Sequence, residues 1–189
     1  LGQMTGRVEM PKEMVKPGLP EWAVWGDRMH RRNLLCSIFL SEPDLEAHNL
    51  HLNRKYQTMS ETEQLSDCFH CDDADWILVA CNTPARMAKG AIRSLRERGV
   101  KAGLFRPITL WPFPIDTLLP LLGRAKGIVV VEAGNGQLED ELRLALSHAE
   151  VHDGPPIHHV RRYGGVLPQQ IEIVDHVAAL DQRSGREEN

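Results

Sequence analysis

Two cysteines lie at the spacing of a metal or redox motif. Cys68 and Cys71 are separated by two residues, and C-x-x-C is the spacing of half a zinc site or of a redox dithiol. A zinc site needs a second pair of ligands, and only the isolated Cys36 and Cys81 remain. Aspartates follow directly, and their negative charge raises the pKa of a thiol. We expect this motif to have no chemical role; a zinc or redox site is the alternative.

A glycine-rich turn offers a second candidate, an anion site. Gly134-Asn-Gly136 follows an apolar run and precedes a helical pattern, so backbone amides at the start of that helix could hold a phosphate. The dinucleotide fingerprint G-x-G-x-x-G is incomplete, because Glu139 stands at its last glycine. A carboxylate at the start of a helix also repels phosphate. The favoured interpretation is a tight turn into a capped helix.

The remaining reactive residues form no catalytic constellation. His158 and His159 are adjacent in a predicted strand, so their side chains point to opposite faces and do not share one metal. The sequence contains neither the nucleophile motif G-x-S-x-G nor the zinc motif H-E-x-x-H. We therefore expect no catalytic residue and no metal ligand in this chain.

Strand and helix patterns alternate over residues 75–182, and these elements determine where the glycine turn and the histidines lie. Apolar runs such as 76–81 are typical of strands buried on both faces of a parallel sheet. The pattern predicts an α/β domain with a three-layer, open, mostly parallel sheet. Residues 183–189 are expected to form a solvated tail. The predicted strands are 76–81, 100–105, 127–132 and 156–160, and the predicted helices are 84–98, 115–122, 138–148 and 168–180.

Residues 1–74 are expected to form an extended arm and a linker helix. Prolines and glycines interrupt residues 1–33, where Trp22 and Trp25 suggest anchors that hold the arm on a surface. A disordered leader is the alternative. Ser41 is a suitable cap for a helix that continues to about residue 62. No start signature accompanies Leu1, so we expect a piece of a longer polypeptide.

Composition limits the classes of partner. The chain has 189 residues, a net charge of −4 and 42% hydrophobic residues, which is typical of a globular protein with no large basic surface for nucleic acid. No apolar run approaches the roughly 20 residues needed to cross a membrane. Four cysteines are too few for a disulfide scaffold of this length, and we expect a reducing, cytoplasmic location.

The most distinctive stretch is a stiff loop at the end of the second predicted strand. Residues 101–114 read KAGLFRPITLWPFP, in which Trp111 and Phe113 alternate with prolines. Proline neither donates to a sheet nor continues a helix, so the loop is rigid. Its aromatic side chains predict that it packs against another surface.

This stretch carries a family resemblance. GLFRPITLWPFP, with NTPARMAKGAIRSLRERGVKAG before it and VVVEAGNGQLEDELRLAL after it, closely resembles the C-terminal domain of the α subunit of 2-oxoacid:ferredoxin oxidoreductases. The segment RRYGGVLPQQIEIVDHV resembles the closing strand, turn and helix of that domain, and the resemblance covers nearly the whole chain. The pattern is most similar to the 2-oxoisovalerate and 2-oxoglutarate branches. A transketolase C-terminal-like fold is implied.

The resemblance also implies partners and cofactors. In the whole enzyme, thiamine pyrophosphate decarboxylates a 2-oxoacid, electrons pass through iron–sulfur clusters to ferredoxin, and coenzyme A accepts the acyl group. The thiamine-binding N-terminal α domain and the β and iron–sulfur subunits hold thiamine pyrophosphate, Mg and the clusters. This chain is therefore expected to bind none of these cofactors and to be inactive alone. The alternative is a free-standing α/β scaffold or small-anion-binding module.

Loops that follow the carboxyl ends of the strands are the candidate functional surface. Open α/β sheets present their binding surfaces at this edge. We expect these loops to form a subunit interface near the active-site mouth; the alternative for Arg106 is that it caps local carbonyls of its own fold. The candidates are Thr83, Arg86, Arg106, Thr109, Trp111, Asn135, Gly136 and Gln137.

Overall fold

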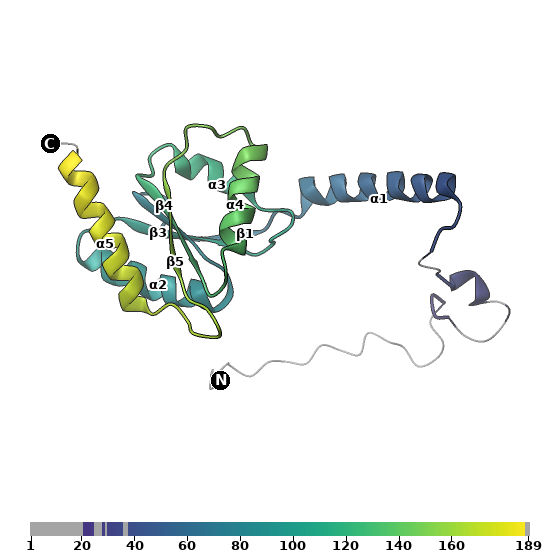
Figure 1. The fold of residues 1–189 in the computed structure, drawn as a ribbon, viewed down its shortest axis with the longest axis horizontal. Helices are drawn as coiled ribbons and strands as arrows, with labels where there is room; N and C mark the ends of the chain where they lie inside the picture. The colour runs from purple at the N-terminus through teal and green to yellow at the C-terminus, as the bar shows by residue number, and fades with distance from the viewer. Residues whose placement is uncertain (1–20, 25–27, 29, 36–37, 188–189) are drawn as a thin grey trace. The chain divides into compact units, whose positions relative to one another are not determined.

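A five-stranded, mostly parallel sheet lies between two layers of helices (Figure 1). The computed structural model describes residues 21–24, 28, 30–35 and 38–187. The chain divides into two units, residues 1–51 and 52–189. The elements are η1 (His30–Asn33), α1 (Glu42–Thr62), β1 (Ser66–Phe69), β2 (Trp76–Val79), α2 (Asn82–Glu97), β3 (Ala102–Pro107), α3 (Ile115–Leu122), β4 (Gly127–Glu132), α4 (Gln137–His148), β5 (Ile157–Arg161) and α5 (Gln170–Glu187).

The strand order is β1-β3-β2-β4-β5. The pairs β2–β3, β2–β4 and β4–β5 are parallel, and only the edge pair β1–β3 is antiparallel among the described strands. Leu78 is the register partner of both Leu104 on β3 and Val129 on β4, so β2 is central. The predicted α/β fold with a mostly parallel sheet is confirmed.

The central strands are apolar throughout because helices cover both faces of the sheet. Every residue of β2 and β4 is buried. Trp76 and Leu78 pack with residues of α2 and α5, whereas Ile77 and Val79 pack with residues of α3 and α4. Alternate side chains of a strand point to opposite faces, so each strand serves two cores.

Helix α2 packs closely on the sheet because much of its inner face is alanine. The helix ends before Gly99, which has a φ of 83°, a left-handed conformation that glycine adopts without a steric penalty. The helix was predicted over residues 84–98 and is observed over Asn82–Glu97. The buried residues of α2 are Ala85, Ala88, Ala91, Ile92 and Leu95.

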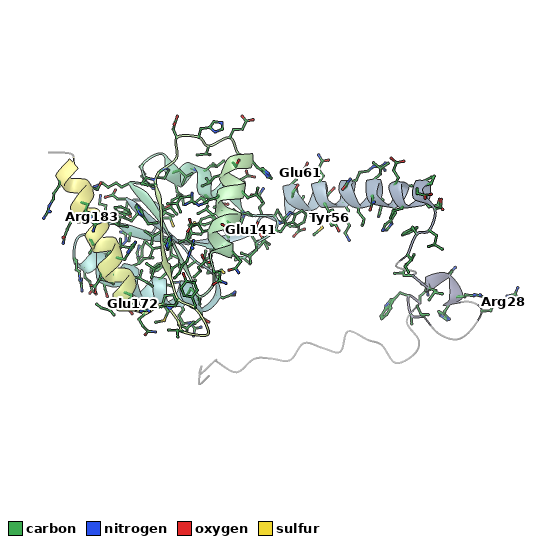
Figure 2. All side chains as sticks on the ribbon, viewed as in Figure 1. Arg28, Tyr56, Glu61, Glu141, Glu172 and Arg183 are labelled. Atoms are coloured by element: carbon green, nitrogen blue, oxygen red, sulfur yellow. The ribbon has the colours of Figure 1, made fainter. Side chains whose placement is uncertain are left out.

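Two elements differ from the sequence expectation. Strand β1 lies in the segment predicted as linker, so the sheet begins before the expected boundary at residue 74. Helix α5 continues to Glu187, through most of the segment predicted as a tail. On α5, Glu172 lies near the start and Arg183 near the end (Figure 2).

The unit that contains residues 1–51 is described only in part. Helix α1 begins directly after Ser41, whose carbonyl accepts a hydrogen bond from the Leu45 N–H at 3.0 Å, as predicted. No residue of α1 is buried. Trp22 is 75% exposed. Trp25 and residues 1–20, which include much of the predicted arm, lie outside the described residues. Within the described part of the chain, no helix has the length and apolar character needed to cross a bilayer.

Candidate functional site

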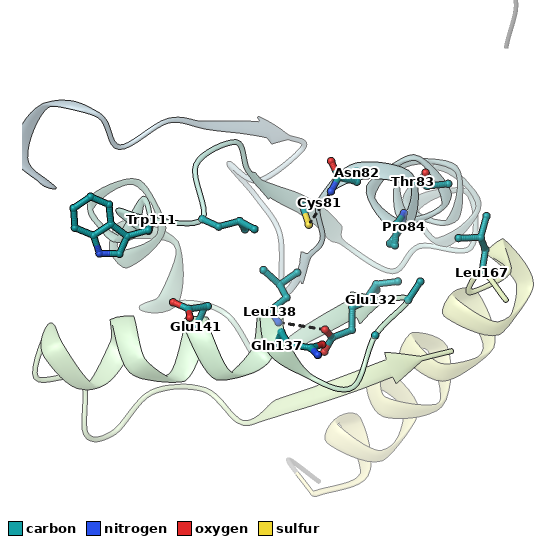
Figure 3. Close-up of a pocket in the computed structure, with 14 residues that line it drawn as sticks. Cys81, Asn82, Thr83, Pro84, Trp111, Glu132, Gln137, Leu138, Glu141 and Leu167 are labelled. Carbon is teal, nitrogen blue, oxygen red and sulfur yellow. Dashed lines mark hydrogen bonds between the residues drawn. The ribbon is translucent and has the colours of Figure 1, made fainter. Parts of the chain in front are cut away.

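A pocket of about 620 Å³ lies where the parallel strands end (Figure 3). Its walls come from the start of α2, the loop after β3, the end of β4 and the first turns of α4, with Leu167 contributed by the segment before α5. Strand β2 has β3 on one side and β4 on the other, so the chain changes direction across the sheet here. Such switch points are where open α/β sheets bind ligands or partners.

The pocket brings together only part of the predicted surface. Thr83, Trp111 and Gln137 line it, from three different strand ends. The other five candidates do not line it. Arg86 is exposed on α2.

The stiff loop anchors one aromatic residue and exposes the other. Phe113 is 8% exposed and packs against Phe105, with ring centroids 6.3 Å apart. Trp111 is 56% exposed, and the ring of Tyr56 meets it edge to face at 5.6 Å. Phe113 therefore anchors the loop in the core. The apolar outer side of the loop, which includes Leu110, is exposed.

Arg106 and Thr109 tie this loop to the edge of the sheet. Arg106 Nε lies 3.4 Å from Asp67 Oδ2 on β1. The Thr109 hydroxyl accepts a hydrogen bond from the Leu65 N–H at 3.1 Å, and the Thr109 N–H donates to the Leu65 carbonyl at 3.2 Å. Arg106 thus pairs with a carboxylate on the neighbouring strand rather than with local carbonyls.

Glu132, the last residue of β4, caps α4 from beneath the pocket. One oxygen of its buried carboxylate accepts a hydrogen bond from the Leu138 N–H at 3.2 Å (Figure 3). The other oxygen lies 3.3 Å from Arg161 Nε on β5. A carboxylate at this position satisfies a free N–H and complements the helix dipole.

A second buried acid extends this charge network. Glu139 accepts hydrogen bonds from Arg161 and from Arg143, the latter at 2.6 Å, and His159 Nδ1 lies 3.4 Å from it. Burial raises the pKa of Glu139, but the hydrogen bond from Arg143 and the charge of Arg161 outweigh it and hold the pKa below its usual value. The network joins β4, β5 and α4.

Nearby side chains accept hydrogen bonds from backbone N–H groups of the glycine turn. Gly136 has a φ of 112°, and the Asn135 N–H donates to the Gln137 side-chain oxygen at 2.9 Å. The Leu138 N–H at the start of α4 donates to the Glu132 carboxylate, so two of the amides around this turn already have acceptors. The geometry fits the capped turn and does not fit a phosphate site.

The surroundings of Cys68 and Cys71 fit a structural role better than a metal or redox site. Cys71 is 2% exposed, and its thiol donates to the Leu104 carbonyl at 3.0 Å. Burial and the neighbouring Cys68 raise the pKa of Cys71 to about 12. Burial also raises the pKa of Cys68, with smaller contributions from Asp67 and Asp72. Within residues 38–187 and the described positions before them, no group of three or more His, Cys, Asp or Glu could hold a metal ion.

Comparison with known families identifies the domain. Residues 74–173, slightly more than half of the chain, match the model of the pyruvate:ferredoxin oxidoreductase core domain II. The chain belongs to this family. The match begins between β1 and β2 and covers the pocket lining at the ends of β2, β3 and β4.

Relatives of this core domain II chain carry the names of 2-oxoacid oxidoreductase subunits. It is 34% identical over 179 residues to the ketoisovalerate oxidoreductase subunit VorB of Methanothermobacter thermautotrophicus, which covers 94% of this chain and 49% of the relative. It is 37% identical over 102 residues to the 2-oxoglutarate synthase subunit KorA of Methanocaldococcus jannaschii, covering 53% of this chain and 26% of that subunit. The chain thus spans about half the length of the VorB relative.

A solved structure supports the fold of this core domain II. The 2-oxoglutarate:ferredoxin oxidoreductase of Magnetococcus marinus superposes with a TM-score of 0.60 at 20% identity, over 75% of this chain and 24% of that chain. This likeness concerns the fold alone.

Sequence patterns missed three residues that shape the pocket of core domain II. Glu132 and Glu141 were not among the candidate residues, and Leu167 lies in a segment with no periodic pattern. An acid that ends a buried strand directly before a glycine turn and a helix is a possible signal of capping. Leu167 lines the pocket because of tertiary packing, and no local sequence pattern predicts this.

Proposed function

We propose that this chain is the C-terminal domain of the α subunit of a thiamine-pyrophosphate-dependent 2-oxoacid:ferredoxin oxidoreductase in the cytoplasm. The whole enzyme decarboxylates a 2-oxoacid oxidatively to an acyl-CoA and reduces ferredoxin. The chain itself has a structural and subunit-interface role and is inactive alone. Its partners are the thiamine-binding N-terminal α domain and the β and iron–sulfur subunits, with ferredoxin and coenzyme A used by the assembled complex.

One observation carries this proposal. The similarity to the ketoisovalerate oxidoreductase subunit runs over 94% of the chain at 34% identity, so it includes the segments before and after the matched core domain. Relatives named for 2-oxoglutarate also match. Because the relatives carry the names of two different 2-oxoacids, the proposal names the class of substrate and not one member.

The interface role is supported by the strand-end loops. The loop after β3 exposes Ile108, Leu110 and Trp111 by 52%, 46% and 56%. Contiguous exposed apolar residues on a globular protein commonly mark an interaction surface. The loop is also held in place from beneath by Phe113 and Thr109, so docking it costs little conformational entropy.

The described residues of the strand-end pocket and the buried Cys71 do not fit the cofactors of the whole enzyme. A diphosphate needs cationic or free N–H donors, whereas the described residues that line the pocket include no Lys, Arg or His. An iron–sulfur cluster needs thiolates, whereas the Cys71 thiol is buried and donates to a carbonyl. We therefore propose that thiamine pyrophosphate, Mg and the clusters are held by other parts of the complex.

Native mass spectrometry of the complex that contains this chain tests the proposal. We expect thiamine-binding and iron–sulfur subunits to co-purify with it in a defined stoichiometry. The complex should reduce ferredoxin with a 2-oxoacid and coenzyme A, tested with 2-oxoisovalerate, 2-oxoglutarate and pyruvate. The isolated chain should turn over none of them.

Two results would contradict the proposal in different ways. A lone monomer under native conditions would favour a free-standing α/β module over a subunit domain. Turnover of a 2-oxoacid by the purified chain without other subunits would show that the chain is catalytic by itself.

A further inference from the structure

Two residues form a ridge between two neighbouring hollows. Trp111 and Glu141 both line the strand-end pocket, and both also line a second pocket of about 530 Å³ between the end of α1, α3 and α4. Because each side chain borders both hollows, they mark the boundary between them. Figure 3 shows the Trp111 indole and the Glu141 carboxylate on the same side of the strand-end pocket.

The indole on this ridge is exposed and held in place. Trp111 is 56% exposed, and the edge-to-face contact with Tyr56 restrains its ring. The face of an indole attracts a cation, and tryptophan is the strongest of the aromatic residues in this respect. An ordered, exposed indole is therefore a suitable seat for an ammonium or guanidinium group.

The carboxylate on this ridge is free to pair. Glu141 is exposed on α4 and, among the described residues, has no cationic partner within the distance of an ion pair. By contrast, Glu139 on the same helix is held by Arg143 and Arg161. An unpaired carboxylate beside an exposed indole provides both components of a cation site.

The surrounding charges favour a cation over an anion. The described residues that line the strand-end pocket include two carboxylates, Glu132 and Glu141, and no basic side chain. Glu132 is 8% exposed and already paired with Arg161, whose Nε lies 3.3 Å from its Oε1, so the unpaired negative charge of this pocket is that of Glu141. In the second pocket, Asp116 adds another acid and His148 is the single titratable base among the described lining residues.

The hollow behind the ridge is apolar. Its apolar lining includes Pro84, Leu110, Leu138 and Leu167. Its volume of about 620 Å³ exceeds that of one side chain, so it fits an apolar side chain together with part of the backbone that carries it. Apolar pockets bordered by polar groups are where interface anchor residues insert.

We infer that the Trp111–Glu141 ridge receives an arginine or lysine from a partner polypeptide, whose neighbouring apolar side chain fills the strand-end pocket. This inference rests on the proposed docking role of the strand-end loops and specifies the chemistry of the segment that docks. The cation stacks on the indole and pairs with the carboxylate, while the apolar neighbour is buried against Leu138 and Leu167.

Affinity measurements on the full chain and the separately produced thiamine-binding domain of the same enzyme test this. Glu141→Gln removes the charge and keeps the size, and we expect it to weaken binding about tenfold at low salt. Trp111→Leu should weaken binding by more than tenfold, as expected for a central aromatic anchor. Glu97→Gln is the matched control, because Glu97 is also an exposed helical glutamate but lines neither pocket.

The salt dependence of binding and the oligomeric state of the chain distinguish the proposed ion pair from other causes of weaker binding. The difference between Glu141→Gln and the wild type should shrink as ionic strength rises, because an exposed ion pair is screened. Equal affinities of Glu141→Gln and Glu97→Gln would overturn the inference. So would self-association of the chain that Glu141→Gln abolishes, since the occupant would then be a second copy.

A peptide probe tests the ridge independently of the proposed function. Acetyl-Leu-Arg-amide should shift the Trp111 indole N–H resonance at lower concentration than acetyl-Leu-Gln-amide, and Glu141→Gln should remove this preference. If the chain does not bind the thiamine-binding domain but shows this preference, the proposed function fails and the cation site stands. If the wild-type chain shows no preference between the peptides, the cation site is overturned.

Discussion

The carboxylate of Glu132 accepts a hydrogen bond from the Leu138 backbone N–H at 3.2 Å, so the last residue of β4 caps the helix that follows it. The same carboxylate lies 3.3 Å from Arg161 Nε on β5. Its side chain is only 8% exposed. One buried acid therefore joins two strands and a helix at the floor of the strand-end pocket.

Replacing Glu132 should destabilise the domain. Glu132→Ala removes the acceptor for the Leu138 N–H and one of the two carboxylates around the Arg161 guanidinium. We expect the free energy of unfolding to fall by about 3 kcal/mol, the size typical of a broken buried ion pair with a lost cap. Urea denaturation followed by circular dichroism measures this.

The conservative replacement at the same position separates charge from capping. Glu132→Gln keeps an oxygen that accepts from Leu138 but places an amide NH2 opposite Arg161 and so loses the ion pair; because the cap is kept, we expect a smaller loss than for Glu132→Ala. Equal losses for the two variants would show that the hydrogen bond to Leu138 contributes nothing measurable.

Gly136 should tolerate no side chain. Its φ is 112°, and a Cβ placed there would lie 2.9 Å from Arg161 Cζ. Gly136→Ala therefore combines a strained backbone with displacement of a paired guanidinium, and we expect a loss of about 2 kcal/mol. Gly123→Ala is the control, because Gly123 has a φ of −62° and open space around it. Equal midpoints of thermal unfolding for the two variants would contradict this explanation.

Most of the sheet could be predicted because its strands are buried on both faces. The runs at 76–79 and 128–131 are uninterrupted apolar segments that end in turn or helix signals. Strand β1 could not be predicted in this way. It is a short edge strand that contains Asp67 and Cys68, and its pairing with β3 depends on tertiary contacts such as Asp67 with Arg106.

The pocket was predicted less well than the fold. The strand-end rule indicated the edge of the sheet at which the pocket lies, and Thr83, Trp111 and Gln137 line it; their function stays a prediction. Glu132 and Glu141 were missed because an acid in a helical or strand-end pattern is usually solvated. Burial of the Glu132 carboxylate depends on Arg161, which lies 29 positions away in the chain.

Cys71 should be inert toward alkylation in the folded chain. Its thiol is 2% exposed, and burial raises its pKa to about 12. Because the thiolate is the reactive form, iodoacetamide at pH 8 should modify Cys71 at least about a hundredfold more slowly in the folded chain than in urea. Peptide mass spectrometry follows each cysteine, with the exposed Cys68 as the internal comparison. Rapid labelling of Cys71 in the folded chain would contradict its buried position.

Two histidines at the contact between β5 and α5, His158 and His176, should make the domain less stable in mild acid. The rings of His158 and His176 lie 6.4 Å apart, with Trp76 6.2 Å from His158, while His159 points to the opposite face toward Glu139. Burial lowers the pKa of both His158 and His176 from the usual 6.5, and the charge of His159 acts in the same direction on each. Both are therefore neutral in the folded chain near neutral pH.

The sign of the pH dependence follows from this lowering. Between pH 6.5 and the lower folded pKa, the unfolded chain binds more protons than the folded chain, so the free energy of unfolding falls as the pH falls through this window. Above pH 6.5 both states are neutral at these positions and the penalty is absent. Urea midpoints from pH 5 to pH 8 measure the slope. His176→Gln should flatten it, whereas His152→Gln, in the exposed segment after α4, should leave it unchanged. A wild-type midpoint that is constant from pH 5 to pH 8 would contradict the neutral state of the pair.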